Sequence, residues 1–190
     1  VTRLLQFARP GDFAGYMESV NVNEVINDCL VLTRHNLDHR NIALERHLDA
    51  ESRVEINRGE LQQVLINLIV NALQAMPDGG RLTLTSRDWL EEGRRIGAEI
   101  AVCDTGQGIA AEDLSRIFDP FFTTKKGSGT GLGLSISYAI VERYGGHISV
   151  TSQPGQGACF TVHLRSEARY ADAPTAPGFA TRWSTPPAQA

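Results

Sequence analysis

Cysteine is scarce in this chain of 190 residues, which has only 3 of them and no C-x-x-C pair. Neither a disulfide framework nor a cysteine zinc site is therefore expected, and a reducing cytoplasm fits best. No run reaches the roughly 18 uninterrupted apolar residues of a membrane helix, because polar amides interrupt the best candidate, 65–76. No secretory signal opens the chain. Since Val1 is not a start Met, we expect a cytoplasmic fragment whose full-length protein can still be membrane-anchored.

Positive charge is also limited, because 18 Lys and Arg stand against 22 Asp and Glu, for a formal net charge of -4 at pH 7. This balance offers no general attraction to nucleic acid, so no nucleic-acid partner is expected. An anionic ligand would need local features such as helix N-termini, exposed backbone amides, a metal ion or a few lysines. The hydrophobic content of 42% fits one ordinary globular domain.

Periodicity and turn residues divide the chain into helices and hairpins. Asn57 and Glu60 have the spacing of a capping box at the start of the strongest helix. The expected helices are 23–37, 58–76, 112–117 and 131–144, and the expected strands are 42–48, 81–88, 98–104, 147–152 and 158–165. Helices alternate with antiparallel hairpins rather than repeating βαβ units. This order predicts an α+β fold, a two-layer sandwich with a mixed, mostly antiparallel sheet and helices on one face.

Two asparagines, Asn67 and Asn71, lie four residues apart on the predicted helix 58–76 and therefore share a face. Asparagine is a mediocre helix former, and this pair lies within nearly continuous apolar sequence. An amide oxygen is a suitable ligand for Mg²⁺. The alternative is that both amides are simply solvated.

The segment Asp104-Thr105-Gly106-Gln107-Gly108-Ile109 directly follows an apolar strand. A carboxylate at that point can accept a hydrogen bond from an amino group while a flat ring approaches the glycine backbone. The alternative is an ordinary tight turn. The spacing also matches a dinucleotide fingerprint, but the acidic residue expected about 20 positions later is replaced by Thr123-Thr124-Lys125-Lys126, so we reject that interpretation.

Glycine occupies every second position of 127–133, immediately before a predicted helix. Such a loop exposes backbone amides beside a helix N-terminus, which suits phosphates. It lacks the P-loop pattern, and a flexible linker is the alternative. Gly155-x-Gly157 by itself indicates only a hairpin turn.

In order and spacing, these segments resemble the catalytic, ATP-binding domain of two-component sensor histidine kinases, and the nitrogen-sensor-like subgroup in particular. The resemblance extends over about 23–165. Its motifs are LQQVLINLIVNA at 61–72 (N box), DTGQG at 104–108 (first G box), IFDPFFTTK at 117–125 (F box), GTGLG at 129–133 (second G box) and GQG at 155–157 (third G box). The resemblance implies a Bergerat fold that binds ATP and Mg²⁺.

By similarity, Asp104 is expected to accept the adenine amino proton, with Gly106 and Gly108 leaving room for the base. Asn71 is expected to hold Mg²⁺, with Asn67 nearby as a catalytic residue. Many relatives carry a lysine three residues after the metal-binding asparagine, where this chain has Gln74, so Lys125 is the expected substitute cation. The further nucleotide-binding residues implied are Ile109, Phe121, Phe122, Gly127, Gly129, Thr130, Gly131, Leu132 and Gly133, with the two phenylalanines packing down a lid.

ATPases that share this fold carry a water-activating glutamate where this chain has Asn67. An amide cannot take a proton at neutral pH, which favours phosphoryl transfer to a separate nucleophile over hydrolysis. None of the 5 histidines has the context of the family's phosphoacceptor motif.

The resemblance therefore implies a protein-histidine kinase fragment that transfers the ATP γ-phosphate to a histidine on a separate dimerisation domain. We expect residues 1–10 to be the remnant of a dimerisation helix, 11–165 the catalytic domain, and 166–190 a flexible Ala/Pro-rich tail. The expected partners are that dimerisation domain and a response regulator, with a homodimeric full-length protein. The alternatives are a degenerate nucleotide-binding module and an ATPase of the same superfold.

Overall fold

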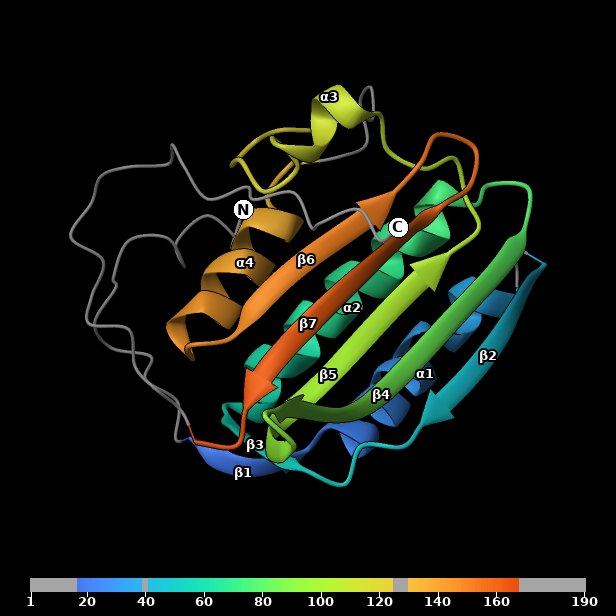
Figure 1. The fold of residues 1–190 in the computed structure, drawn as a ribbon. Helices are drawn as coiled ribbons and strands as arrows, with labels where there is room; N and C mark the ends of the chain where they lie inside the picture. Colours follow the sequence, from blue (N-terminus) through green and yellow to red (C-terminus); the bar gives the residue numbers. More distant parts are fainter. Residues whose placement is uncertain (1–16, 39–40, 125–129, 168–190) are drawn as a thin grey trace, which may run out of the picture.

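A computed structural model describes residues 17–38, 41–124 and 130–167. They form two layers, with a five-stranded sheet on one side and helices on the other (Figure 1). The order of the sheet is β2 (Ile42–Leu48), β4 (Gly80–Glu91), β5 (Arg94–Asp104), β7 (Ala158–Arg165) and β6 (His147–Ser152). The β2–β4 pair is parallel and the other pairs are antiparallel. The predicted α+β sandwich with a mixed, mostly antiparallel sheet is confirmed.

The helices are α1 (Val22–Asp38), α2 (Arg58–Ala75), α3 (Ala111–Leu114) and α4 (Gly133–Arg143). Their bounds agree with the sequence prediction to within a few residues. As predicted, the Asn57 side chain caps α2 by accepting from the backbone N–H of Glu60 at 3.1 Å. The reciprocal half of the capping box is absent, because the Asn57 N–H donates instead to the hydroxyl of Tyr144 at 3.3 Å.

The core lies between the sheet and α2, which runs between α1 and α4 behind the central strands (Figure 1). Alternate residues of the strands point toward the helices, as the pleat of a sheet requires. Leu84, Ile100 and Val162 from the sheet and Leu65 and Leu68 from α2 are completely or almost completely buried. Burying each such side chain stabilises the fold by roughly 1.5 to 3 kcal/mol.

A second, two-stranded antiparallel sheet pairs β1 (Glu18–Asn21) with β3 (Arg53–Ile56), and the sequence prediction missed it. Each strand has only 4 residues, which is too short for a clear alternating pattern. The pairing is held by tertiary burial, because Val20, Val54 and Ile56 are at most 2% exposed.

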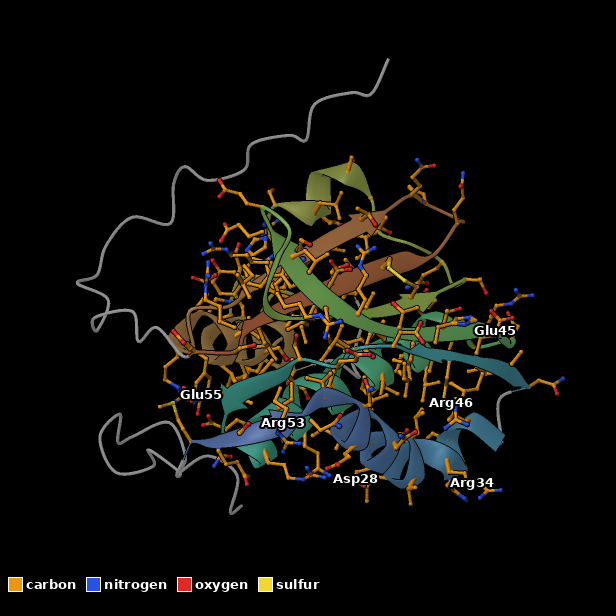
Figure 2. The ribbon with its side chains drawn as sticks, turned by 60° about the horizontal axis from the view of Figure 1, so that its bottom comes forward. Asp28, Arg34, Glu45, Arg46, Arg53 and Glu55 are labelled. Atoms are coloured by element: carbon orange, nitrogen blue, oxygen red, sulfur yellow. A yellow bond between two sulfur atoms is a disulfide. The ribbon has the colours of Figure 1, made fainter. Side chains whose placement is uncertain are left out.

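The side of the molecule formed by α1, β2 and β3 carries charges of both signs (Figure 2). The labelled side chains Asp28, Arg34, Glu45, Arg46, Arg53 and Glu55 lie on this surface. Arg58 pairs with Asp28 at 2.7 Å, and Arg81 pairs with Glu45 at 3.1 Å. Exposed pairs of this kind contribute little to stability.

The structure corrects the expectation that the cysteines are unpaired. Cys103 on β5 and Cys159 on β7 are register partners, and a disulfide joins their sulfur atoms. The two residues lie 56 positions apart, so no local spacing signalled the pair. Cys29 is free and buried. Within the ranges that the structure describes, no helix is long and apolar enough to span a membrane.

Candidate functional site

A pocket of about 650 Å³ opens where β5 ends and α4 begins. This volume falls within the usual range for small-molecule sites, roughly 300 to 1,000 Å³. Its walls come from the second half of α2, the segment after β5, the residues around the start of α4, and the beginning of β7. The described lining contains the carboxylates of Asp104 and Asp113 but no lysine or arginine. An anionic group bound there must therefore be compensated by backbone dipoles, a cation, or residues outside that lining.

Asp104 is the last residue of β5 and lines the pocket. Its side chain is on the helix-facing side of the sheet, in phase with Ile100 and Val102, so the residue is only 8% exposed. One carboxylate oxygen accepts the backbone N–H of Gly106 at 2.8 Å. Apolar Ile109, together with β7 residues, completes this part of the wall. A half-apolar slot with a fixed carboxylate can take a flat ring that carries an amino group.

The glycines after Asp104 bring three segments of backbone together. A Cβ on Gly106 would lie 2.3 Å from the carbonyl oxygen of Ala75, at the end of α2. Gly108 has φ +70°, and a Cβ there would lie 2.0 Å from the carbonyl oxygen of Gln153. The resemblance implied that both glycines leave room for a base. The structure shows that both permit close backbone packing, that Gly108 also lines the pocket, and that Gly106 is absent from the lining.

Ser152, which the sequence prediction missed, ties this loop to the β6–β7 turn. Its hydroxyl accepts the backbone N–H of Ile109 at 2.9 Å and donates to the carbonyl oxygen of Gly157 at 2.6 Å. Gly157 has φ +83°, and a Cβ there would lie 1.9 Å from the carbonyl oxygen of Asp104. The third glycine segment therefore supports the site from behind rather than lining it.

Asn67 and Asn71 both lie on the pocket side of α2 and are half-buried, as their spacing predicted. The amide nitrogen of Asn67 donates to the carbonyl oxygen of Gly133 at 3.2 Å and to the hydroxyl of Ser137 at 3.3 Å. This nitrogen is therefore engaged by α4. Gln74 lines the pocket three residues beyond Asn71, on the same helical face.

The N-terminus of α4 borders the pocket through Thr130, Gly131 and Gly133. Leu132 precedes the first helical residue, and its side chain makes no capping hydrogen bond. The Thr130 hydroxyl accepts the Leu132 N–H at 3.4 Å, which shapes the entry to the helix. Because the first N–H groups of a helix lack intrahelical acceptors, this end suits an anion such as a phosphate.

The two phenylalanines after Pro120 have different environments, whereas the sequence prediction gave them one role. Phe122 lines the pocket, and the guanidinium of Arg116 lies 4.6 Å from its ring centroid. Phe121 is 74% exposed and has φ +67°. Its backbone N–H donates to the carbonyl oxygen of Gly131 at 2.9 Å. The prediction that both rings pack down this segment is therefore wrong for Phe121, whose contact is made by its backbone.

The structure gathers most of the predicted site residues around one cavity. Asn67, Asn71, Asp104, Gly108, Ile109, Phe122, Thr130, Gly131 and Gly133 line it, and Gly106, Phe121 and Leu132 do not. Lys125, Gly127 and Gly129 lie outside the described residues, as do the predicted segment 1–10 and the tail from residue 168. Ala158 and Phe160 line the pocket from β7, and no local sequence signal marked them.

Comparisons with known proteins found relatives in both sequence and structure. The family model described as histidine kinase-, DNA gyrase B-, and HSP90-like ATPase matches residues 56–168. The chain is 40% identical over 165 residues to the sensor histidine kinase ZraS of Escherichia coli (strain K12), covering 86% of this chain and 34% of ZraS. The chain therefore spans about a third of the length of this relative.

Two solved structures are similar in both fold and sequence. The nucleotide-free catalytic domain of histidine kinase ThkA has a TM-score of 0.71 and 33% identity, covering 80% of this chain and 96% of that one. A structure of ThkA in complex with the response regulator protein TrrA has a TM-score of 0.66 and 32% identity, covering 79% of this chain and 42% of that one.

Proposed function

Because the chain belongs to the histidine kinase-, DNA gyrase B-, and HSP90-like ATPase family, as a sensor histidine kinase catalytic domain, we propose how its residues divide the work of binding ATP and transferring its γ-phosphate. The observation that carries the proposal is one pocket lined by Asp104, Asn71 and the N-terminus of α4. These are, in order, an acceptor for an amino group, an oxygen ligand for a cation, and a set of phosphate-binding amides.

Adenine recognition falls to Asp104. Its carboxylate is held in place by the Gly106 N–H, so it can accept the adenine amino group without reorganising. Guanine presents a carbonyl at the corresponding position, which would place two acceptors face to face. An unpaired buried group costs roughly 1 to 3 kcal/mol, more if charged, so ATP should be strongly preferred over GTP.

The phosphates are assigned to the start of α4, where Gly131 and Gly133 allow close approach to backbone N–H groups. The donor set fits Mg²⁺, because the Asn71 amide supplies one oxygen and this ion takes its other ligands from phosphates and water. No cluster of three or more His, Cys, Asp or Glu that could hold a metal occurs in the part of the chain that the structure describes. Bound Mg²⁺ would neutralise charge on the phosphate oxygens. Lys125 is the proposed additional cation.

Transfer rather than hydrolysis is favoured by Asn67. Its amide cannot accept a proton from water, and its nitrogen already donates to Gly133 and Ser137. A histidine imidazole needs little activation. Its nitrogen forms the bond to the γ-phosphorus as the bond to the bridging oxygen breaks, which leaves ADP.

The proposed phosphoacceptor is a histidine of the dimerisation domain in a homodimeric full-length protein. We place residues 1–10 at the end of that domain, 11–165 in the catalytic domain, and 166–190 in a tail. The complex of ThkA with TrrA supports a response regulator as the next partner, because this chain is similar to ThkA.

A transfer assay tests this function. The chain is mixed with ATP labelled at the γ-phosphate, Mg²⁺ and a separate dimerisation domain from its own full-length protein. We expect acid-labile phosphate on the added domain and none on this chain. An added domain whose acceptor histidine is changed to glutamine is the control, and Asn71→Asp in this chain should abolish transfer. Release of free phosphate without labelling of the added domain would favour an ATPase instead.

A further inference from the structure

Ser137 is an unusual residue for its place in the fold. It lies on α4 with 0% exposure, one turn before Ile140 and Val141, which are also buried. A hydroxyl in such an apolar contact is costly unless it is hydrogen-bonded. Its hydroxyl donates to the Gly133 carbonyl oxygen at 2.9 Å and accepts the Asn67 amide at 3.3 Å.

A serine that bonds back to the carbonyl four residues earlier is common within helices. The additional feature here is Asn67, whose amide nitrogen reaches across from α2 to both the Ser137 hydroxyl and the Gly133 carbonyl. A Cβ added to Gly133 would lie 3.7 Å from the Asn67 amide carbon, an ordinary van der Waals distance, so the amide lies directly beside the start of α4. Three polar groups from two helices therefore form one closed unit.

This unit lies between the two elements that the proposed function uses for the phosphates. Asn71, the proposed metal ligand, follows Asn67 by one turn of α2. Gly133 is the first residue of α4, whose N-terminus borders the pocket. The position of Asn71 relative to the phosphate-binding amides therefore depends on the contact between Asn67, Ser137 and Gly133.

We propose that Ser137 is a positioning residue for the triphosphate: acting through Asn67, it holds the N-terminus of α4 in register with Asn71. The inference rests on the proposed function. Removing the hydroxyl leaves the Asn67 amide with the Gly133 carbonyl alone, so α4 is held less firmly to α2 at the pocket end, while Asp104 on β5 stays in place. The loss should therefore fall on the part of the nucleotide affinity that comes from the γ-phosphate, and not on the part that comes from the base.

The experiment compares Ser137→Ala with the unmodified chain by calorimetric titration with a non-hydrolysable ATP analogue and with ADP, both with Mg²⁺. We expect affinity for the analogue to fall about threefold to tenfold, as for a lost neutral hydrogen bond, and affinity for ADP to change by less than about twofold. Ser137→Thr keeps the hydroxyl and should retain most of the ratio between the two affinities.

Ser135→Ala is the matched control. Its hydroxyl donates to the Leu132 carbonyl oxygen at 3.0 Å, within the same segment, so its loss should leave the ratio unchanged. Asn67→Ala should lower the analogue affinity in the same direction as Ser137→Ala, and the double variant should lose less than the product of the two single effects.

Two outcomes overturn the positioning role. One is an equal loss of both affinities in Ser137→Ala, which leaves their ratio unchanged, and the other is no loss of either affinity. A merely structural hydroxyl would change the thermal unfolding midpoint without changing this ratio. Failure of the proposed function is a different outcome: the wild-type chain would then bind neither nucleotide.

Discussion

The two ends of α4 are tied to α2 by different kinds of bond. At the pocket end, neutral groups of Asn67, Ser137 and Gly133 meet at 2.9 to 3.3 Å. At the far end, the Tyr144 hydroxyl donates to the Glu60 carboxylate at 2.6 Å, and Arg143 pairs with the same carboxylate. Charge-assisted bonds are stronger, but a carboxylate beside the phosphates would repel them. The fold therefore uses charged links far from the pocket and neutral links beside it.

The sheet shows the same division. At the pocket end, β5 and β7 contribute Asp104, Ala158 and Phe160 to the lining, and the Cys103–Cys159 link lies on the opposite face of the sheet. Farther along the same strands, on the face away from the helices, His163 lies 3.0 Å from Glu99, which also pairs with Arg87 at 2.8 Å. Polar groups at the far end thus support the fold, whereas Asp104 at the pocket end lines the cavity.

Among these predictions, reduction of the disulfide between Cys103 and Cys159 should change the stability most. Because a disulfide joins Cys103 to Cys159, reductant should lower the free energy of unfolding by about 2 to 4 kcal/mol, since the link constrains the unfolded chain. Urea unfolding with and without dithiothreitol measures this difference. In Cys159→Ser the difference should vanish. Identical unfolding of the unmodified chain in both conditions would show that the thiols stay reduced.

Asp104→Asn should separate ligand binding from stability. The amide oxygen can still accept the Gly106 N–H, but it is a weaker acceptor for the adenine amino group, and the amide can turn its donors toward the base. ATP affinity should fall at least about tenfold, the equivalent of roughly 1.4 kcal/mol. Titration with ATP measures the loss, and circular dichroism should show an intact fold. Wild-type affinity for ATP in the variant would remove Asp104 from the site.

Tyr144→Phe should have the opposite profile at the far end of α4. The variant loses the donor to Glu60 and the acceptor for the Asn57 N–H, so the free energy of unfolding should fall by about 1 to 2 kcal/mol. Affinity for ATP should not change. Tyr138→Phe, on the half-buried ring beside Phe118, is the control for removing a hydroxyl from the same helix. A loss of ATP affinity in Tyr144→Phe would contradict the view that bonds at the far end of α4 affect stability alone.

The pKa of Tyr144 gives this prediction a pH dependence. Burial, and then the bond to Glu60, raises this pKa from 10.0 to about 12. The stabilising contribution is therefore complete below about pH 10 and is lost as the pH rises toward 12. The difference in stability between the unmodified chain and Tyr144→Phe should shrink over that window.

The smallest effect is expected at His163. Burial lowers the pKa of this imidazole, although Glu99 opposes the shift, and His147 and Arg87 lower it further. The imidazole therefore binds a proton more readily in the unfolded chain than in the folded one. Protonation of His163 lowers the stability of the protein as the pH falls below 6.5, the ordinary pKa of histidine. Urea unfolding at pH 7.5 and 5.5 should show a larger loss for the unmodified chain than for His163→Gln. An equal loss in both proteins would contradict this sign.

Elements whose signals are local could be predicted from the amino-acid sequence alone. The apolar face of α2 and the cap at Asn57 predicted that helix, and alternation with turn residues predicted both hairpins of the large sheet. The spacing of Asn67 and Asn71 placed them on one face. These inferences hold because helical and strand periodicities are properties of neighbouring residues. That Asp104 and the glycines before α4 share a site was implied by the resemblance to sensor histidine kinases.

Contacts between groups that are far apart in the sequence depend on the packing of the folded chain. In the folded chain, β1 pairs with β3 and a disulfide joins Cys103 to Cys159. The Asn57 N–H donates to the Tyr144 hydroxyl and not to Glu60. The amide nitrogen of Asn67 donates to Ser137. Gly106 is needed because a Cβ there would clash with the backbone of α2. No spacing along the chain contains these pairings, because each depends on how two elements pack. A hydrogen bond or a close backbone approach is set by distances of a few tenths of an ångström, which only the packed core fixes.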